Sequence, residues 1–142
     1  MTVETYMTTG VQTAQPETTL YEVAQLMRDI DTGVVPVVSG GALVGIITDR
    51  DIVVRAVADG ADPRTARCED YLTRNPTTVT PDTSVQQAAQ LMQRDQVRRL
   101  PVVSGSDLVG IISLGDLAVT SGKDKLVGDT LEEISEPSGS AP

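Results

Sequence analysis

The sequence predicts an α+β fold made of two β-α-β-β-α repeats that pack as a pseudo-two-fold pair. Three observations lead to this prediction. The chain matches itself without gaps at an offset of about 65 residues, and each copy contains a helix with apolar residues at helical spacing. Each copy also contains two β-rich runs joined by a glycine-containing turn. One copy of roughly 50 residues has too small an interior to be stable alone, so the pair should be the folding unit.

The internal repeat is clearest where the strands are expected. LVGIITDRDIVV from Leu43 aligns with LVGIISLGDLAV from Leu108, and VPVVSG from Val35 aligns with LPVVSG from Leu100. These matches divide the chain into a first repeat (1–60), a linker (61–72), a second repeat (73–122) and an acidic tail (123–142) that we expect to be flexible.

A helix is predicted early in each copy. Thr19 with Glu22, and Ser84 with Gln87, have the form of a capping box, in which the hydroxyl accepts a hydrogen bond from a backbone N–H of the first turn. Apolar residues then recur at helical spacing, and we expect them to face the core. They are Leu20, Val23, Ala24, Met27 and Ile30 in the first copy, and Val85, Ala88, Ala89 and Met92 in the second.

The strands and the remaining helices follow from β-branched runs and glycines. A short extended segment precedes each helix, at 11–14 and 77–80, and the β-rich runs cover 34–38 and 43–48 with counterparts at 99–103 and 108–113. Each copy ends in a second helix that begins near Asp49 or Leu114, and Gly60 is a suitable residue to end the first of these. A short helix is also expected at 68–72.

Composition and charge exclude several classes of function. The formal charge of -9 would repel a phosphate backbone, so nucleic acid is not an expected partner. No run of apolar residues is long enough to span a bilayer and the N-terminus lacks the features of a signal peptide, so we expect a cytoplasmic protein. Histidine is missing and Cys68 is the single cysteine, which removes the usual general base, the commonest zinc ligand and any internal disulfide. Carboxylate or lysine chemistry stays open, but nothing in the sequence points to it, and we expect neither a metal site nor an enzyme.

Each copy ends in the same short motif. It reads GIITDRD from Gly45 and GIISLGD from Gly110: a glycine, two apolar residues, a threonine or serine, and an aspartate three residues further on. Together with the preceding helix and the Pro-Val-Val run, this motif resembles the CBS domain, which occurs in tandem pairs called Bateman modules. TDRDIVVRAVADGADP and QVRRLPVV are similar to small stand-alone bacterial CBS-domain proteins of the hypoxic-response type.

The resemblance implies a non-catalytic regulatory module that needs no cofactor. Such pairs bind AMP, ADP or ATP, and sometimes S-adenosylmethionine, in clefts between the repeats, and they commonly form homodimers. The motif fits this chemistry, because a carboxylate can accept hydrogen bonds from two neighbouring ribose hydroxyls and a threonine or serine can bind the sugar or the phosphate.

The two implied clefts differ in charge. Ser113 and Asp116 head one cleft, and Arg98 and Arg99 precede its Pro-Val-Val strand, where guanidinium groups can bind phosphate in bidentate fashion. The first copy has Gly33 and Val34 at those two positions, so the cleft of the second copy is the better candidate for a phosphorylated ligand. By resemblance, its adenine wall would include Ile111, Thr32 and the backbone near Gln12. The other cleft would use Thr48, Asp51, Ile46 and Val97, with Arg50 or Arg55 as the nearby base.

Structural roles are the alternative for these same residues. Thr48 or Asp49, and Ser113, can serve simply as helix N-caps, and an aspartate in the first helical turn is favoured by the helix dipole alone. Arg98 and Arg99 can serve to keep an exposed strand edge soluble.

Two further functions compete with nucleotide sensing. The chain can be a dimeric interaction or stress-related scaffold with vestigial ligand clefts, for which the tail from Lys123 would be a docking segment to a protein partner. A hydrolase that uses Asp49 and Asp51 is the weaker alternative, because residues two apart on a helix point to different faces.

Overall fold

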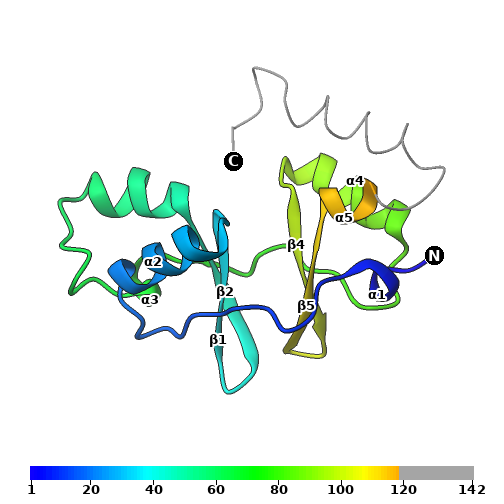
Figure 1. The fold of residues 1–142 in the computed structure, drawn as a ribbon, viewed down its shortest axis with the longest axis horizontal. Helices are drawn as coiled ribbons and strands as arrows, with labels where there is room; N and C mark the ends of the chain where they lie inside the picture. Colours follow the sequence, from blue (N-terminus) through cyan, green and yellow to red (C-terminus); the bar gives the residue numbers. More distant parts are fainter. Residues whose placement is uncertain (119–142) are drawn as a thin grey trace. The chain divides into compact units, whose positions relative to one another are not determined.

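A computed structural model describes residues 1–118 of the chain, which form two compact units (Figure 1). One unit consists of residues 12–76, and the other combines Met1–Val11 with the described chain from Thr77 onward. Each unit has its own apolar core of buried aliphatic side chains. The predicted combination of helices with antiparallel β-structure is confirmed, and we refer to the units as the 12–76 unit and the 77–118 unit.

An antiparallel hairpin forms the sheet of each unit. In the 12–76 unit β1 (Val34–Ser39) pairs with β2 (Ala42–Thr48), and in the 77–118 unit β4 (Arg99–Ser104) pairs with β5 (Asp107–Ser113), which confirms the four predicted strands. The first turn needs its glycines, because Gly40 and Gly41 have φ values of 59° and 86°. The predicted extended segments make parallel bridges to these hairpins, from Ala14 to Val37 and from Val79 to Val102.

The two predicted long helices are confirmed as α2 (Leu20–Ile30) and α4 (Val85–Asp95). Thr19 accepts a hydrogen bond from the Glu22 backbone N–H at 3.2 Å, and Ser84 accepts one from Gln87 at 3.0 Å, as expected of N-caps.

The buried faces of these helices agree with the sequence pattern except at two positions. Buried residues are Leu20, Val23 and Met27 on α2 and Val85, Ala88, Ala89 and Met92 on α4. The prediction was wrong for Ala24, which is exposed, and for Ile30, which is 43% exposed at the end of α2. Helical spacing predicts which residues of α2 share a face, but not how much of that face is buried. The three buried residues of α2 pack in the core of the 12–76 unit.

The last helix of each copy begins directly after a strand. In the 12–76 unit the helix includes Asp49 and Arg50 and continues as η1 (Asp51–Val57), a π-helical stretch that the sequence does not predict. Gly60 follows with φ of 74°, in the conformation typical of a helix C-terminal glycine. The described part of the counterpart is α5 (Leu114–Ala118).

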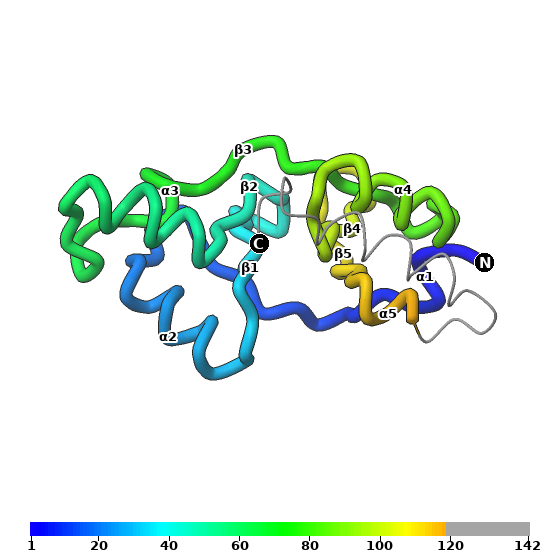
Figure 2. The backbone as a smooth tube through the Cα atoms, turned by 90° about the horizontal axis from the view of Figure 1, so that it is seen from above, coloured from blue at the N-terminus to red at the C-terminus, as the bar shows by residue number. Residues whose placement is uncertain are grey.

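The 77–118 unit is completed by the start of the first repeat, and the 12–76 unit by the linker and the start of the second repeat. α3 (Cys68–Tyr71), which confirms the predicted short helix, and β3 (Thr73–Arg74) pack in the 12–76 unit, where β3 pairs with β2. Their counterparts at an offset of 65 are α1 (Val3–Tyr6), which the sequence analysis did not predict, and the bridge from Thr8 to Ile111 in the 77–118 unit. Figure 2 shows α1 beside α4 and α5, and Figure 1 agrees.

The same backbone hydrogen bonds hold both exchanged helices. Val3 donates to the Thr83 carbonyl at 2.8 Å, and Cys68 donates to the Thr18 carbonyl at 2.8 Å. The side chains of Val3 and Cys68 are both 0% exposed. The first repeat therefore supplies Val3 to the core of the 77–118 unit, and the linker supplies Cys68 to the core of the 12–76 unit. The division into repeats at 1–60 and 73–122 stays a division of the sequence, and the predicted tail at 123–142 lies outside the described residues.

Candidate functional site

The predicted motif residues lie where the last strand of each hairpin meets the following helix. Asp51 accepts a hydrogen bond from the Thr48 backbone N–H at 3.0 Å, and Thr48 Oγ1 accepts one from the Asp51 N–H at 3.0 Å. The second copy has the same reciprocal pair between Ser113 and Asp116, at 2.8 and 3.1 Å. The alternative that these residues cap helices is therefore confirmed. Capping occupies only one lone pair of each aspartate and holds the carboxylate in a fixed orientation.

The carboxylate of Asp116 has spare capacity to accept hydrogen bonds. Oδ2 accepts from the Ser113 N–H, and within residues 1–118 the carboxylate has no other hydrogen bond and no ion pair. The Asp116 side chain is half-buried. A fixed, half-buried carboxylate with a free oxygen is suited to bind a pair of hydroxyl groups on a small molecule.

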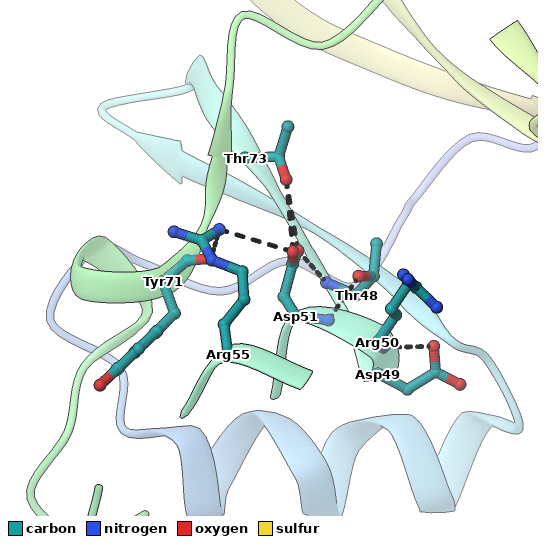
Figure 3. A network of polar contacts seen from close by, with 7 residues as sticks. All are labelled: Thr48, Asp49, Arg50, Asp51, Arg55, Tyr71 and Thr73. Atoms are coloured by element: carbon teal, nitrogen blue, oxygen red, sulfur yellow. Dashed lines mark hydrogen bonds and ion pairs between the residues drawn. The ribbon is translucent and has the colours of Figure 1, made fainter. Parts of the chain in front are cut away.

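The carboxylate of Asp51 is already bound by other groups of the 12–76 unit (Figure 3). The Thr73 hydroxyl, which has one proton to donate, lies 3.5 and 3.4 Å from Oδ1 and Oδ2, and Arg55 Nη1 lies 3.6 Å from Oδ1. The same Arg55 nitrogen donates to the Tyr71 carbonyl at 2.7 Å, which fixes the guanidinium beside the aspartate. The Asp51 side chain is 12% exposed, against 49% for Arg55.

Two arginines lie beside the Ser113–Asp116 pair. Arg99 is the residue opposite Ser113 in the β4–β5 register, and the Arg98 carbonyl accepts a hydrogen bond from the Leu114 N–H at 2.8 Å. Both side chains are exposed, and neither forms an ion pair with any residue in the described part of the chain. The hairpin therefore places the backbones of both arginines at the junction that holds Asp116, with both side chains exposed.

The equivalent junction in the first copy has an acidic side chain and lacks the two arginines. Val34 lies opposite Thr48, and the Gly33 carbonyl accepts from the Asp49 N–H at 2.9 Å. The Asp49 carboxylate lies against Gly33, since a Cβ atom on that glycine would be 2.9 Å from Asp49 Oδ2. An acidic side chain thus occupies the neighbourhood that Arg98 occupies in the second copy.

The other predicted site residues divide between the units. Val97 and Ile111 are half-buried in the 77–118 unit, where Ile111 exchanges backbone hydrogen bonds with Thr8 at 2.8 and 3.0 Å. Ile46 is half-buried and Arg50 and Gln12 are exposed in the 12–76 unit. Thr32 is in that unit too, and its hydroxyl bonds the backbone of Val34 in a local turn. The assignment of Thr32 and Gln12 to the site of the second copy, and of Val97 to that of the first, stays a prediction.

Sequence reasoning missed two members of the Asp51 network. Thr73 and the Tyr71 carbonyl belong to the exchanged segment, which the linear order of the repeats places with the second copy. The one available signal was the offset of 65, which pairs Thr73 with Thr8 just after a short helix in each copy.

Residues 1–118 show neither a metal-binding cluster nor a membrane-spanning helix. They contain no group of three or more Asp, Glu, Cys or His side chains that could hold a metal ion. None of the described helices combines the length and the apolar character needed to cross a bilayer.

Comparison with known proteins gives concordant matches. The family model of the CBS domain matches residues 3–57 and again 68–123. The chain is 42% identical to the CBS domain-containing protein YhcV of Bacillus subtilis, over 94% of each chain. It is 37% identical to Hypoxic response protein 1 of Mycobacterium tuberculosis, over 82% of each chain.

Solved structures agree with these matches. The crystal structure of Hypoxic Response Protein I with two coordinated zinc ions matches with a TM-score of 0.76 and 37% identity, over 83% of this chain and 97% of that one. The structure of CBSX2 in complex with AMP matches with a TM-score of 0.73 and 25% identity, over 82% of this chain and 92% of that one.

Proposed function

This chain belongs to the CBS-domain family, and on that premise we propose that it is a non-catalytic regulatory module that binds an adenosine nucleotide beside Asp116. The observation that supports this most is the grouping of Ser113, Asp116, Arg98 and Arg99 at one junction of the 77–118 unit. A structural neighbour, CBSX2, was solved in complex with AMP, which makes adenine nucleotides the first ligands to test.

The four residues have different roles in the proposed site. The free oxygen of Asp116 accepts hydrogen bonds from the ribose hydroxyls, and Ser113 keeps the carboxylate oriented. Arg98 and Arg99 bind the phosphate through charge-assisted hydrogen bonds. Apolar contact from Ile111 on β5 supports the base. The site therefore favours AMP, ADP or ATP over S-adenosylmethionine, which has no phosphate for the arginines.

Regulation follows if the ligand binds two arrangements of the module with different affinity. Binding then shifts the population toward the arrangement that holds the nucleotide more tightly. We propose that a partner protein reads this shift.

The test is the change in melting temperature on addition of AMP, ADP or ATP. A ligand at one hundred times its Kd stabilises the folded state by about 2.7 kcal/mol. Asp116→Asn keeps an oxygen that can cap the helix but removes the carboxylate, so the ligand-induced shift should disappear. Asp51→Asn is the matched control and should retain the shift.

Arg98→Gln with Arg99→Gln should weaken AMP binding while leaving adenosine binding unchanged. Absence of a shift with every nucleotide at millimolar concentration would exclude the proposed function.

A dimeric scaffold is the second candidate, and an exposed apolar surface favours it. Val53, Val54 and Val57 on η1 are 61%, 50% and 61% exposed. Apolar side chains that are exposed and close together are often covered by a partner, and we propose that a second copy of the chain covers them.

Light scattering at micromolar concentration should give twice the chain mass of 15.0 kDa, and Val53→Asp with Val57→Asp should give the monomer. A wild-type monomer would contradict dimerisation. A dimer that binds no nucleotide would favour the scaffold over the sensor.

A further inference from the structure

The Asp51 carboxylate differs from its counterpart Asp116 in what surrounds it. Arg55 Nη1 lies 3.6 Å from Asp51 Oδ1, and the Thr73 hydroxyl lies within hydrogen-bond distance of both oxygens. Only 12% of the Asp51 side chain is exposed (Figure 3). The Thr48 N–H also donates to Oδ2, so three groups of the same chain already surround the carboxylate that a ribose would have to reach.

Arg55 is held in this position from a second side. Its Nη1 donates to the Tyr71 carbonyl at 2.7 Å, and its guanidinium carbon lies 6.0 Å from the centre of the Tyr71 ring. The guanidinium is thus bound both to η1, through Asp51, and to α3, through Tyr71. A bound nucleoside would have to displace a cation that has two partners.

Within residues 1–118, the Asp116 carboxylate of the second repeat has no such partners. At the offset of 65, position 55 corresponds to Thr120, which lies outside the described residues and whose side chain carries no charge to pair with Asp116. Thr8 corresponds to Thr73, but within residues 1–118 no hydrogen bond joins Thr8 to Asp116. The difference between the two aspartates therefore comes from identified side chains.

We propose that Arg55 and Thr73 determine which of the two repeats binds ligand, by occupying the Asp51 carboxylate and closing the ribose position of the first repeat. This proposal rests on the proposed function, because it assumes that the equivalent carboxylate of Asp116 binds the ribose of a nucleotide. It makes Arg55 a specificity-determining residue and sets the number of nucleotides bound at one per chain.

The charge of the first repeat also defines what an opened site would accept. The Asp49 carboxylate lies against Gly33, and Gly33 and Val34 stand where the second copy has Arg98 and Arg99. Removal of Arg55 makes this neighbourhood more negative, so a phosphate group would be repelled. The opened site should take an uncharged nucleoside, and adenosine is the probe of choice.

The experiment is isothermal titration calorimetry on the full chain, first with AMP and then with adenosine. Wild-type protein titrated with AMP should bind one equivalent, and Asp116→Asn should abolish this binding. Adenosine is then titrated into the Asp116→Asn variant with and without Arg55→Gln. Glutamine retains a neutral donor for the Tyr71 carbonyl and removes the charge beside Asp51. Adenosine should bind only when Arg55→Gln is present, with one equivalent per chain, and the addition of Asp51→Asn should abolish it. Thr73→Val, which removes the hydroxyl at nearly constant volume, should strengthen the new site further.

The outcomes separate the two proposals. If the wild type binds no AMP, the proposed function fails. If it binds one AMP that depends on Asp116 but Arg55→Gln and Thr73→Val open no second site, the proposed function stands and the role of Arg55 and Thr73 is refuted. If the wild type binds two AMP molecules, Asp51 is not closed and the role is refuted as well. Circular dichroism melting of each variant shows whether it is folded, so that loss of binding is not mistaken for loss of the fold.

Discussion

Replacement of Val3 by alanine should destabilise the unit that contains the second repeat, although Val3 lies at the start of the first. The Val3 side chain is 0% exposed and belongs to the core of the 77–118 unit. Loss of two buried methyl groups costs about 0.8 kcal/mol each in transfer free energy, and the remaining cavity adds to this. The free energy of unfolding should therefore fall by about 2–3 kcal/mol, and the melting temperature by roughly 5–10 °C.

Amide hydrogen exchange locates the effect. Faster exchange is expected in β4, β5 and α4, whose core contains Val3, and a much smaller change in β1 and β2. Ile30→Val is a suitable control, since Ile30 is 43% exposed and the loss of one carbon there should change stability by no more than about 0.5 kcal/mol. Val3 does not pack in the core of the 77–118 unit if Val3→Ala is as mild as this control, or if the faster amide exchange is confined to β1 and β2.

Two other predictions concern the 12–76 unit. Gly45→Ala should cost about 2–3 kcal/mol, measured by urea denaturation, because the new Cβ would overlap the Thr73 carbonyl oxygen of β3. Gly115→Ala is its control and should be neutral or slightly stabilising, since its Cβ would make an ordinary contact at 3.6 Å. Burial, with a smaller effect of Glu22, raises the pKa of the Cys68 thiol from 9.0 to about 11. The thiol therefore ionises more readily in the unfolded chain, and its contribution to stability, fully present below pH 9, is lost as the pH rises from 9 to 11. The denaturation midpoint of the wild type should fall more steeply over that range than that of Cys68→Val, and parallel curves would contradict the buried, neutral thiol.

The sequence was sufficient to predict the elements that a repeat and local patterns specify. The offset of 65 places both hairpins, and the capping residues Thr19 and Ser84 mark the start of both long helices. The resemblance to CBS domains, carried by the motifs that end at Asp51 and Asp116, is confirmed by the match of the family model to both copies. These features depend on residues near one another in the chain, so a single sequence contains them.

Features that depend on distant contacts were not predictable in the same way. The helix α1 has four residues and no side-chain cap, and it is stabilised by backbone bonds to a loop about 80 residues away, at Pro81 and Thr83. The contact of Thr73 with Asp51 arises from the exchanged segment, which linear order does not show. The π-helical stretch of η1 likewise has no sequence signal that we identified.

The most direct test of the central claim is a crystal structure of the full chain grown with AMP. We expect the ribose hydroxyls on the carboxylate of Asp116, the phosphate on Arg98 and Arg99, and Asp51 still paired with Arg55. Phosphate density remote from both arginines, or ribose bound to Asp51 with Arg55 displaced, would show that the nucleotide does not bind as proposed.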